Sequence, residues 1–422
     1  MFQAPRGTRD FTPEEMEKRR YIEKNMAATF TSFGYGEIQT PTFEALELFT
    51  AKSGESIVNE IYTFTDKGGR QLALRPELTA PVIRCYVERL QMEPKPLKLF
   101  YFGNCYRYDR PQKGRYREFQ QAGCELIGAD TPEAIAELLA CAFTLLKNIG
   151  LKNVRINIGN LTIVNELFST LNLQKDDQKI LLPLIDKSQF DDLRVSLRDY
   201  GVSDKTADQF IRVLQTSNIE EIQAIIQKNE TATKELSAMK TVLNLLTHAF
   251  KITEYGIKLG IVRGLDYYKG IVFEIDAPVL GAEKQLCGGG SYELVSLFGG
   301  SDVPTAGFAI GFDRTILALE AEGFVFPPPT LDVYIIPVNQ EMLSTAIEIA
   351  QRLRMESISV DFDQLRRGVG KSLKYAAAKH ADTVIIVGPK ELEKQSVTLR
   401  DMKTGNQEIV AITEIHSKLK HI

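Results

Sequence analysis

Residues 106–125 read YRYDRPQKGRYREFQQAGCE, a run of arginine, lysine, glycine and proline between two aromatic-rich segments. The flanking segments, LKLFYFGNCYRY at 97–108 and REFQQAGCELIG at 117–128, have the composition of β-strands. The pattern predicts a long antiparallel hairpin with a basic tip. The cations of this tip, set against the single carboxylate of Asp109, are Arg107, Arg110, Lys113, Arg115 and Arg117. A basic loop held between strands is a better candidate for a functional site than an ordinary solvated face.

Strand and helix signals on both sides extend this hairpin into a larger domain. Residues 13–33 have helical spacing, and IYTFTD with QLALR predicts a second hairpin before residue 76. Thr79 and Pro81 predict the cap and first turn of a helix, which places Glu77 on the loop that enters it. Strand signals return in GIVFEID, LCGGGSYELV and AGFAIGFDR. Together these elements predict an antiparallel sheet with flanking helices, an α+β domain.

Two changes of composition predict the domain organisation. Residues at about 165–255 carry repeated helical patterns with little strand signal, which predicts a helical insertion. The run Pro327 to Pro329 disfavours helix on either side and predicts a boundary. Beyond it, strand and helix signals alternate, so residues 330–422 are expected to form a small α/β domain. The first domain is expected to occupy residues 1–325.

Composition narrows the class of protein. In 422 residues, 44% are hydrophobic and 25% charged, without a run long enough for a membrane span or a signal-peptide core, so a cytoplasmic globular protein is expected. A net charge of −4 argues against indiscriminate coating of nucleic acid. Five widely spaced cysteines predict neither a disulfide framework nor a zinc site. A second basic cluster is by itself most simply a solvated face; it contains Arg366, Arg367, Lys371, Lys374 and Lys379.

Five blocks in fixed order resemble the signatures of histidyl-tRNA synthetases, a family of class II aminoacyl-tRNA synthetases. They are LRPELTAP at 74–81, the stretch at 106–125, RGLDYYKGIVFE at 263–274, CGGGSYELV at 287–295 and GFAIGFDR at 307–314. The likeness runs from PRGTRDF at the N-terminus through the C-terminal domain. It implies a class II catalytic domain, a C-terminal anticodon-binding domain and a homodimer, with histidine, ATP, Mg²⁺ and histidine tRNA as ligands. The activity it implies is that of a histidine-tRNA ligase.

The resemblance assigns residues to the chemistry of ATP. Arg107 would bind the α-phosphate, because a guanidinium matches phosphate oxygens. Phe119 would lie under the adenine, and Arg314 would cover the base and reach the γ-phosphate. Arg263, peculiar to histidine enzymes in this class, would approach the same α-phosphate from the amino-acid side. Asp109 and Arg115 complete the ATP-binding set. Amino-acid activation needs positioning and charge neutralisation more than proton transfer, so Arg263 and Arg107 are the expected catalytic residues.

The resemblance also assigns the histidine pocket. Glu77, Thr79 and Gln121 would bind the substrate ammonium, while Glu125, Tyr267 and Tyr268 would hold the imidazole ring. A pocket that accepts a hydrogen bond from the ring can reject other amino acids without an editing domain. The chain departs from the family pattern at Leu78, and at Ser291 and Glu293, where the family usually has arginine and aspartate.

Three features bear on partners and alternatives. FGYGEIQTPTFE at 33–44 resembles the class II dimer segment, and Arg366, Arg367, Lys371 and Lys374 would contact tRNA. A non-catalytic paralogue that regulates the transferase opening histidine biosynthesis is the main alternative, although such proteins typically lack the C-terminal domain. A class II synthetase for proline, threonine or glycine is disfavoured by RGLDYY, and an RNA-sensing module leaves the activation blocks without a purpose.

Overall fold

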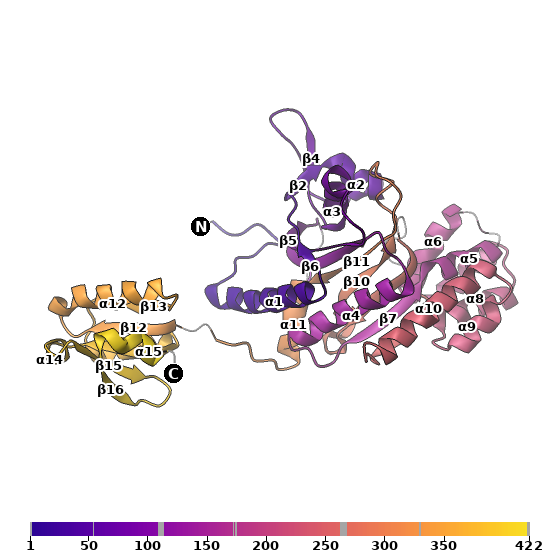
Figure 1. Cartoon of the computed structure of the whole chain (residues 1–422). Helices are drawn as coiled ribbons and strands as arrows, with labels where there is room; N and C mark the ends of the chain where they lie inside the picture. Colours follow the sequence, from indigo (N-terminus) through magenta and orange to yellow (C-terminus); the bar gives the residue numbers. More distant parts are fainter. Residues whose placement is uncertain are drawn as a thin grey trace. The chain divides into compact units, whose positions relative to one another are not determined.

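The computed structural model describes residues 2–53, 55–108, 114–171, 173, 175–261, 268–328 and 331–419. The chain divides into two compact units, one formed by residues 1–12 and 18–325 and the other mainly by residues 326–422. Each unit has its own sheet (Figure 1), and each has its own apolar core. Within the described residues, no helix has both the length and the apolar character required to cross a membrane.

The large unit is built on one mixed sheet whose central strands are antiparallel and whose edge strands run parallel to their neighbours. In spatial order its strands are β1 (Gly36–Glu37), β5 (Leu97–Tyr106), β6 (Glu118–Ile127), β11 (Thr305–Gly311), β10 (Gln285–Tyr292), β9 (Tyr268–Asp276), β7 (Arg155–Asn160) and β8 (Tyr255–Ile257). β5 and β6 form the hairpin expected from residues 97–128. Strands far apart in the sequence, such as β6 and β11, therefore lie side by side.

One face of this sheet is covered by α1 (Pro13–Ser32), α4 (Pro132–Asn148) and α11 (Phe312–Ala321). The ring of Phe30 in α1 stacks on Phe100 of β5 with centroids 4.9 Å apart, and on Phe308 of β11 at 6.0 Å. Thr131 caps α4 by accepting a hydrogen bond from the backbone N–H of Ala134. Burial of these aromatic and aliphatic side chains ties the helices to the sheet.

The other face of the sheet is partly covered and partly open. Helix α3 (Thr79–Cys85) packs Leu78, Val82 and Tyr86 against Tyr101 of β5 and Tyr292 of β10. Beside it lies a small antiparallel sheet of β2 (Phe43–Ala45), β4 (Gln71–Leu74) and β3 (Thr63–Thr65). The short helices nearby are α2 (Leu46–Ser53), η1 (Glu55–Glu60) and η2 (Tyr86–Leu90), whereas η3 (Pro278–Glu283) lies against α11 (Phe312–Ala321).

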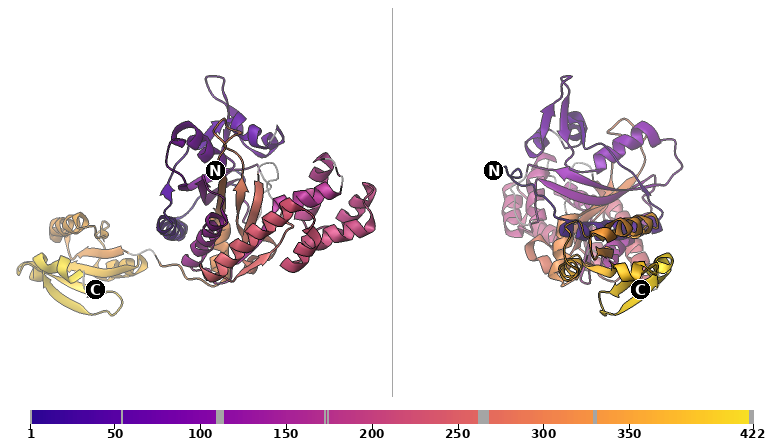
Figure 2. Two further views of the ribbon diagram at one scale, coloured as in Figure 1. Left: turned by 45° about the vertical axis from the view of Figure 1, so that its right-hand side comes forward. Right: turned by 90° about the vertical axis from the view of Figure 1, so that its left-hand side faces the viewer.

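Helices at the β7 end of the sheet form a cluster (Figure 2), and buried apolar side chains give this cluster its own core. They are α5 (Leu161–Thr170), α6 (Lys175–Asp186), α7 (Phe190–Asp199), α8 (Asp204–Gln215), α9 (Ile219–Ile226) and α10 (Glu230–His248). Their strongly one-sided distribution of apolar residues explains why they pack together; in α8, for example, Phe210, Ile211 and Leu214 are buried. These helices separate β7 from β8 in the chain.

The C-terminal unit is a small α/β fold with sheet order β13-β12-β14-β15-β16. Its strands are β12 (Leu331–Pro337), β13 (Val360–Phe362), β14 (Ala381–Val387), β15 (Ser396–Asp401) and β16 (Gln407–Ala411). Its helices are η4 (Gln340–Met342), α12 (Leu343–Met355), α13 (Val369–Ala378), α14 (Pro389–Leu392), η5 (Ile412–Glu414) and α15 (Ile415–Leu419). A sheet with flanking helices followed by an α/β unit confirms the fold class expected from the sequence.

Candidate active site

The open face of the large sheet is shaped by the alternation of side chains along its strands. In β6, Phe119, Gln121 and Glu125 project to the same face, because side chains two residues apart share a face. On the neighbouring strand β11, Gly307 lies opposite Glu125 and Gly311 lies opposite Gln121. Gly311 has open space beside it and lines a cavity over this face, whereas the space beside Gly307 is taken by the Glu125 carboxylate.

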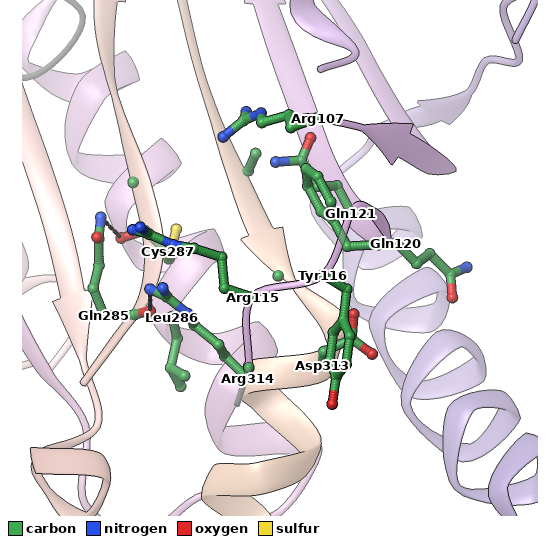
Figure 3. A pocket seen from close by; sticks show the side chains of 15 residues that line it. Arg107, Arg115, Tyr116, Gln120, Gln121, Gln285, Leu286, Cys287, Asp313 and Arg314 are labelled. Carbon is green, nitrogen blue, oxygen red and sulfur yellow. Dashed lines mark hydrogen bonds between the residues drawn. The ribbon is translucent and has the colours of Figure 1, made fainter. Parts of the chain in front are cut away.

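A cavity of about 230 Å³ lies over this face, bordered by guanidinium groups and by strand backbone. Figure 3 shows that Arg107, Arg115 and Arg314 reach toward the same space from different segments of the chain. The candidate residues that line it are Arg107, Arg115, Phe119, Gln121 and Arg314. The structure therefore gathers most of the predicted ATP-binding residues around one cavity. The other two, Asp109 and Arg263, lie outside the described residues.

Arg107 and Arg314 are each oriented by backbone carbonyl groups. Arg107 Nε donates to the carbonyl oxygen of Pro76 at 2.9 Å, and its guanidinium lies 5.2 Å from the centroid of the Phe119 ring. Arg314 Nη1 donates to the carbonyl oxygen of Gln285 at 3.1 Å, and Nη2 pairs with Glu283 at 2.5 Å. Both cations thus line the cavity in fixed orientations, an arrangement suited to binding phosphate.

Glu125 is a buried carboxylate held by two tyrosine hydroxyls. Tyr101 donates to Oε1 at 3.0 Å and Tyr292 donates to Oε2 at 2.5 Å. Burial raises the pKa of Glu125 to about 7, although the hydrogen bonds from Tyr292, Thr79 and Tyr101 oppose the shift. Burial, with the neighbouring Glu125, also raises the pKa of Tyr101 and of Tyr292 well above the ordinary tyrosine value. Both hydroxyls therefore remain proton donors, and the carboxylate can accept a further hydrogen bond.

Gly307 allows this carboxylate to sit where it does. A Cβ at position 307 would lie 2.0 Å from Oε2 of Glu125, closer than any non-bonded contact allows. Tyr101, Tyr292 and Gly307 were not among the residues predicted from the sequence. Tyr292 lies inside the quoted block 287–295, but its partner is 167 residues away along the chain. Only the strand order brings the two together.

Of the residues assigned to the substrate ammonium, Glu77 and Thr79 lie close to Glu125, and Gln121 lies four residues away on the same face of β6. Helix α3 begins at Thr79, and the Glu77 carboxylate, rather than Thr79, accepts the N–H of Ala80 at 3.2 Å. Gln121 Oε1 accepts a hydrogen bond from Cys105 Sγ at 3.3 Å. Burial raises the pKa of Cys105 to about 12, so this group stays a neutral thiol. Glu77 thus has a defined position at the start of α3, and Gln121 has one at the cavity, which it lines.

The aromatic residues assigned to the imidazole are only partly described. Tyr268 packs edge-on against Tyr292 with ring centroids 6.3 Å apart, within the same apolar cluster as Tyr101. Tyr267 lies outside the described residues. The departures at Ser291 and Glu293 do not touch Glu125. Ser291 pairs with Ala306 on the helix-covered face and borders a separate cavity, and Glu293 forms an ion pair with Lys269.

The basic cluster of the C-terminal unit is divided by the fold. Lys371 and Lys374 are exposed on α13, three residues apart and therefore on one side of the helix, and Arg366 is exposed just before it. Arg367 instead pairs with the buried Asp363 at 2.6 Å and lies 4.2 Å over the ring of Tyr375. Arg367 therefore stabilises the C-terminal unit through these two contacts, a role that the sequence pattern did not indicate.

Comparisons with known proteins agree with this geometry. The family model described as histidyl-tRNA synthetase matches residues 7–315, and the one described as anticodon binding domain matches residues 332–422. The histidine-tRNA ligase of Methanospirillum hungatei is 45% identical over 421 residues, covering 99% of each chain. The histidine-tRNA ligase of Methanosarcina acetivorans is 43% identical over 418 residues, covering 98% of each chain.

A solved structure matches the fold over the whole chain. The structure of apo histidyl-tRNA synthetase from S. aureus superposes with a TM-score of 0.76 at 31% identity, and the match covers all of both chains. Sequence and fold agree from the N-terminal residues to the C-terminal unit. The chain therefore belongs to the histidyl-tRNA synthetase family.

Proposed function

We propose that this chain joins histidine to its tRNA in two steps, and that both steps occur over the open face of the large sheet. One observation carries the proposal. Along β6, Phe119 lies beside the Arg107 guanidinium, and six residues further on Glu125 forms a buried hydrogen-bond acceptor. A stacking ring with a cation suits a nucleotide, and a buried acceptor suits an imidazole N–H. The enzyme is therefore an aminoacyl-tRNA synthetase with ATP as a substrate.

In the first step the carboxylate of histidine attacks the α-phosphorus of ATP. A bond forms between the carboxylate oxygen and phosphorus, and the bond to pyrophosphate breaks, giving histidyl-adenylate. Arg107 would bind the α-phosphate, Phe119 would stack under adenine, and Arg115 and Arg314 would bind the rest of the triphosphate. Arg263 and Asp109 enter this proposal from the sequence resemblance alone. In the second step the terminal hydroxyl of the tRNA attacks the carbonyl carbon and AMP leaves.

Selection of histidine is assigned to the pocket around Glu125. The ring would donate a hydrogen bond to the Glu125 carboxylate beside Tyr267 and Tyr268, and the ammonium would be bound by Glu77, Thr79 and Gln121. An amino acid without a ring N–H would leave one acceptor position of the buried carboxylate unfilled, which is costly in a site of low polarity. This difference in binding free energy explains selection at the activation step without a second, editing site.

Mg²⁺ is part of the proposal as a companion of ATP. Such ions are usually held by substrate phosphates with one or two carboxylates, and they neutralise phosphate charge. In this site the ion would enter the cavity with ATP, held chiefly by the phosphate oxygens.

The proposed division of labour follows the two units. We assign catalysis to residues 1–325, interrupted by the helical insertion at about 165–255, and anticodon binding to residues 330–422. The exposed lysines of α13 support a contact with tRNA phosphates. Arg366 and the partly exposed Arg367 would add to the same surface.

Reversing charge on α13 tests the tRNA assignment. We expect Lys371→Glu with Lys374→Glu to raise the Michaelis constant for tRNA by roughly 10-fold, since each phosphate contact contributes a salt-dependent attraction. Pyrophosphate exchange, which needs no tRNA, should not change. The matched control is Lys390→Glu with Lys394→Glu, which alters two other exposed lysines of the unit by the same charge. Equal effects of the two pairs would reject a specific role for α13.

A homodimer also belongs to the proposal, on two observations. The segment 33–44 is held by the buried guanidinium of Arg75, which donates to the carbonyl oxygens of Thr40 at 2.8 Å and Pro41 at 3.0 Å. Phe43, near the end of this segment, and Phe64 on β3 expose their rings and pack edge-on, with centroids 6.0 Å apart. A rigid segment beside exposed aromatic rings is suited to contact with a second copy.

Amino-acid-dependent exchange of labelled pyrophosphate into ATP tests the function itself. We expect exchange with histidine and none above background with the other standard amino acids, including proline, threonine and glycine. Omitting the amino acid provides the blank. Exchange with no amino acid at all would favour the regulatory paralogue, and binding to a transferase partner would then be the property to measure.

A further inference from the structure

Residues 5–11, here called the N-terminal arm, lie against the chain that returns from the basic loop. The backbone N–H of Arg117 donates to the carbonyl oxygen of Gly7 at 2.8 Å. Gly7 has φ of 89°, and a Cβ there would lie 2.7 Å from the Arg117 side chain. The close approach and the left-handed backbone both favour glycine at this position. The arm is therefore attached to the loop that carries Arg115.

Arg9 of the arm connects two separate walls of the cavity. Its guanidinium donates to the hydroxyl of Tyr116 at 3.0 Å and lies 4.1 Å from the centroid of that ring. The same guanidinium forms an ion pair with Asp313, in the first turn of α11. Tyr116 and Asp313 both line the cavity and stand close together in Figure 3. One side chain thus contacts two segments that are 197 positions apart in the chain, as their residue numbers show.

Arg19 of α1 holds Asp313 from the interior. Its Nη1 lies 2.9 Å from the Asp313 carboxylate, and its Nη2 donates to Oε1 of Gln120 at 2.8 Å. Arg19 is 4% exposed and Asp313 is 6% exposed. A buried carboxylate needs a partner, and Arg19 supplies one without help from Arg9. Removing Arg9 therefore leaves Asp313 paired and should leave the domain folded.

Each residue that Arg9 contacts is next in sequence to an arginine of the cavity. Tyr116 directly follows Arg115, and Asp313 directly precedes Arg314. Both arginines line the cavity on long side chains, whose placement depends on the backbone from which they extend. Fixing Tyr116 and Asp313 to one guanidinium sets the spacing between those two backbones. Preorganised cations bind and stabilise phosphate better than mobile ones.

We propose that Arg9 is a positioning residue that sets Arg115 and Arg314 at the spacing needed to bind the triphosphate of ATP. The inference rests on the proposed function of this cavity as the ATP site. It assigns the N-terminal arm a part in nucleotide binding, although the arm does not line the cavity. Histidine binding is assigned to Glu125, which Arg9 does not contact. The Michaelis constant for histidine should therefore not depend on Arg9.

Steady-state pyrophosphate exchange with Arg9→Ala in the full chain tests the proposal. We expect the Michaelis constant for ATP to rise about 10-fold, as for loss of a charge-assisted contact, and that for histidine to stay within about twofold. The midpoint of thermal unfolding should stay close to that of the native chain. The matched control is Arg20→Ala, which removes an arginine that is 64% exposed and pairs only with Glu23 among the described residues.

Two further variants test whether Arg9 positions the cavity arginines or only stabilises the fold. Arg9→Lys retains the ion pair with Asp313 but not the planar contact with Tyr116, so partial recovery of ATP binding is expected. Tyr116→Phe should weaken ATP binding, and its effect should not add fully to that of Arg9→Ala. An unchanged ATP constant in Arg9→Ala, or equal rises for ATP and histidine, would overturn the inference. Absence of exchange in the native chain would instead reject the proposed function.

Discussion

Replacing Glu125 with glutamine is expected to lower kcat/KM for histidine in pyrophosphate exchange by roughly 10²- to 10³-fold. In the native pocket the carboxylate accepts from Tyr101 and Tyr292 and still has acceptor capacity for the imidazole. The glutamine amide keeps the shape but replaces one acceptor oxygen with a donor NH₂ group. A donor would then face either a tyrosine hydroxyl or the ring N–H. The Michaelis constant for ATP should change little.

The same residue predicts a pH dependence. Burial raises the pKa of Glu125 to about 7, so the carboxyl group is neutral below that pH and ionised above it. Activation of histidine should therefore decline as the pH falls through about 7, in addition to the decline from protonation of the substrate imidazole near 6.5. In Glu125→Gln, only the decline in kcat/KM caused by protonation of the substrate imidazole should remain. The comparison requires kcat/KM for histidine across pH 5.5 to 9 in both proteins.

A stability measurement distinguishes loss of the pocket from loss of the fold. A carboxyl group with a raised pKa binds its proton more tightly in the folded than in the unfolded chain, so folded stability falls as the pH rises toward 7. Glu125→Gln removes this ionisation and should be no less stable than the native chain at pH 8.

Tyr292→Phe, which removes one hydrogen-bond donor to Glu125 and keeps the ring, should have an intermediate effect on kcat/KM for histidine. If Glu125→Gln retained histidine activity within threefold, the pocket assignment would be wrong.

The second large effect is expected at Arg107. Arg107→Ala should lower kcat for exchange on the order of 10²- to 10³-fold, because a preorganised donor at developing phosphate charge typically contributes that much. Its guanidinium is directed by the carbonyl of Pro76 and packed against Phe119, so it needs little reorganisation when ATP binds. Single-turnover formation of histidyl-adenylate under saturating ATP and histidine measures the step directly.

Matched variants define the role of Arg107. Arg107→Lys keeps the charge but not the planar fork, and only part of the rate should return. Arg70→Ala is the control, since that side chain is 79% exposed and pairs with Asp66 in the turn between β3 and β4. An increase confined to the Michaelis constant for ATP, with kcat unchanged, would show that Arg107 binds the nucleotide without acting on the transition state.

Local patterns in the sequence predicted the fold class and much of the candidate site. The hairpin at 97–128 followed from two strand-like runs about a basic loop, because alternation and turn residues act over short distances. Phe119, Gln121 and Glu125 lie on one face of β6 for the same local reason, the two-residue period of a strand. The ordered blocks then indicated the family, which sequence and structural comparisons show.

Tertiary structure alone decided how distant segments complete that site. Tyr292 reaches Glu125 from 167 residues away, and Arg9 reaches Asp313 from 304 residues away. Likewise, Arg367 looked like one of several free cations until the fold placed it on the buried Asp363. These contacts depend on strand order and on which helices cover each face. Strand order and helix placement are determined by how the apolar surfaces of the whole domain pack together. A local pattern of residues in the sequence therefore does not predict these contacts.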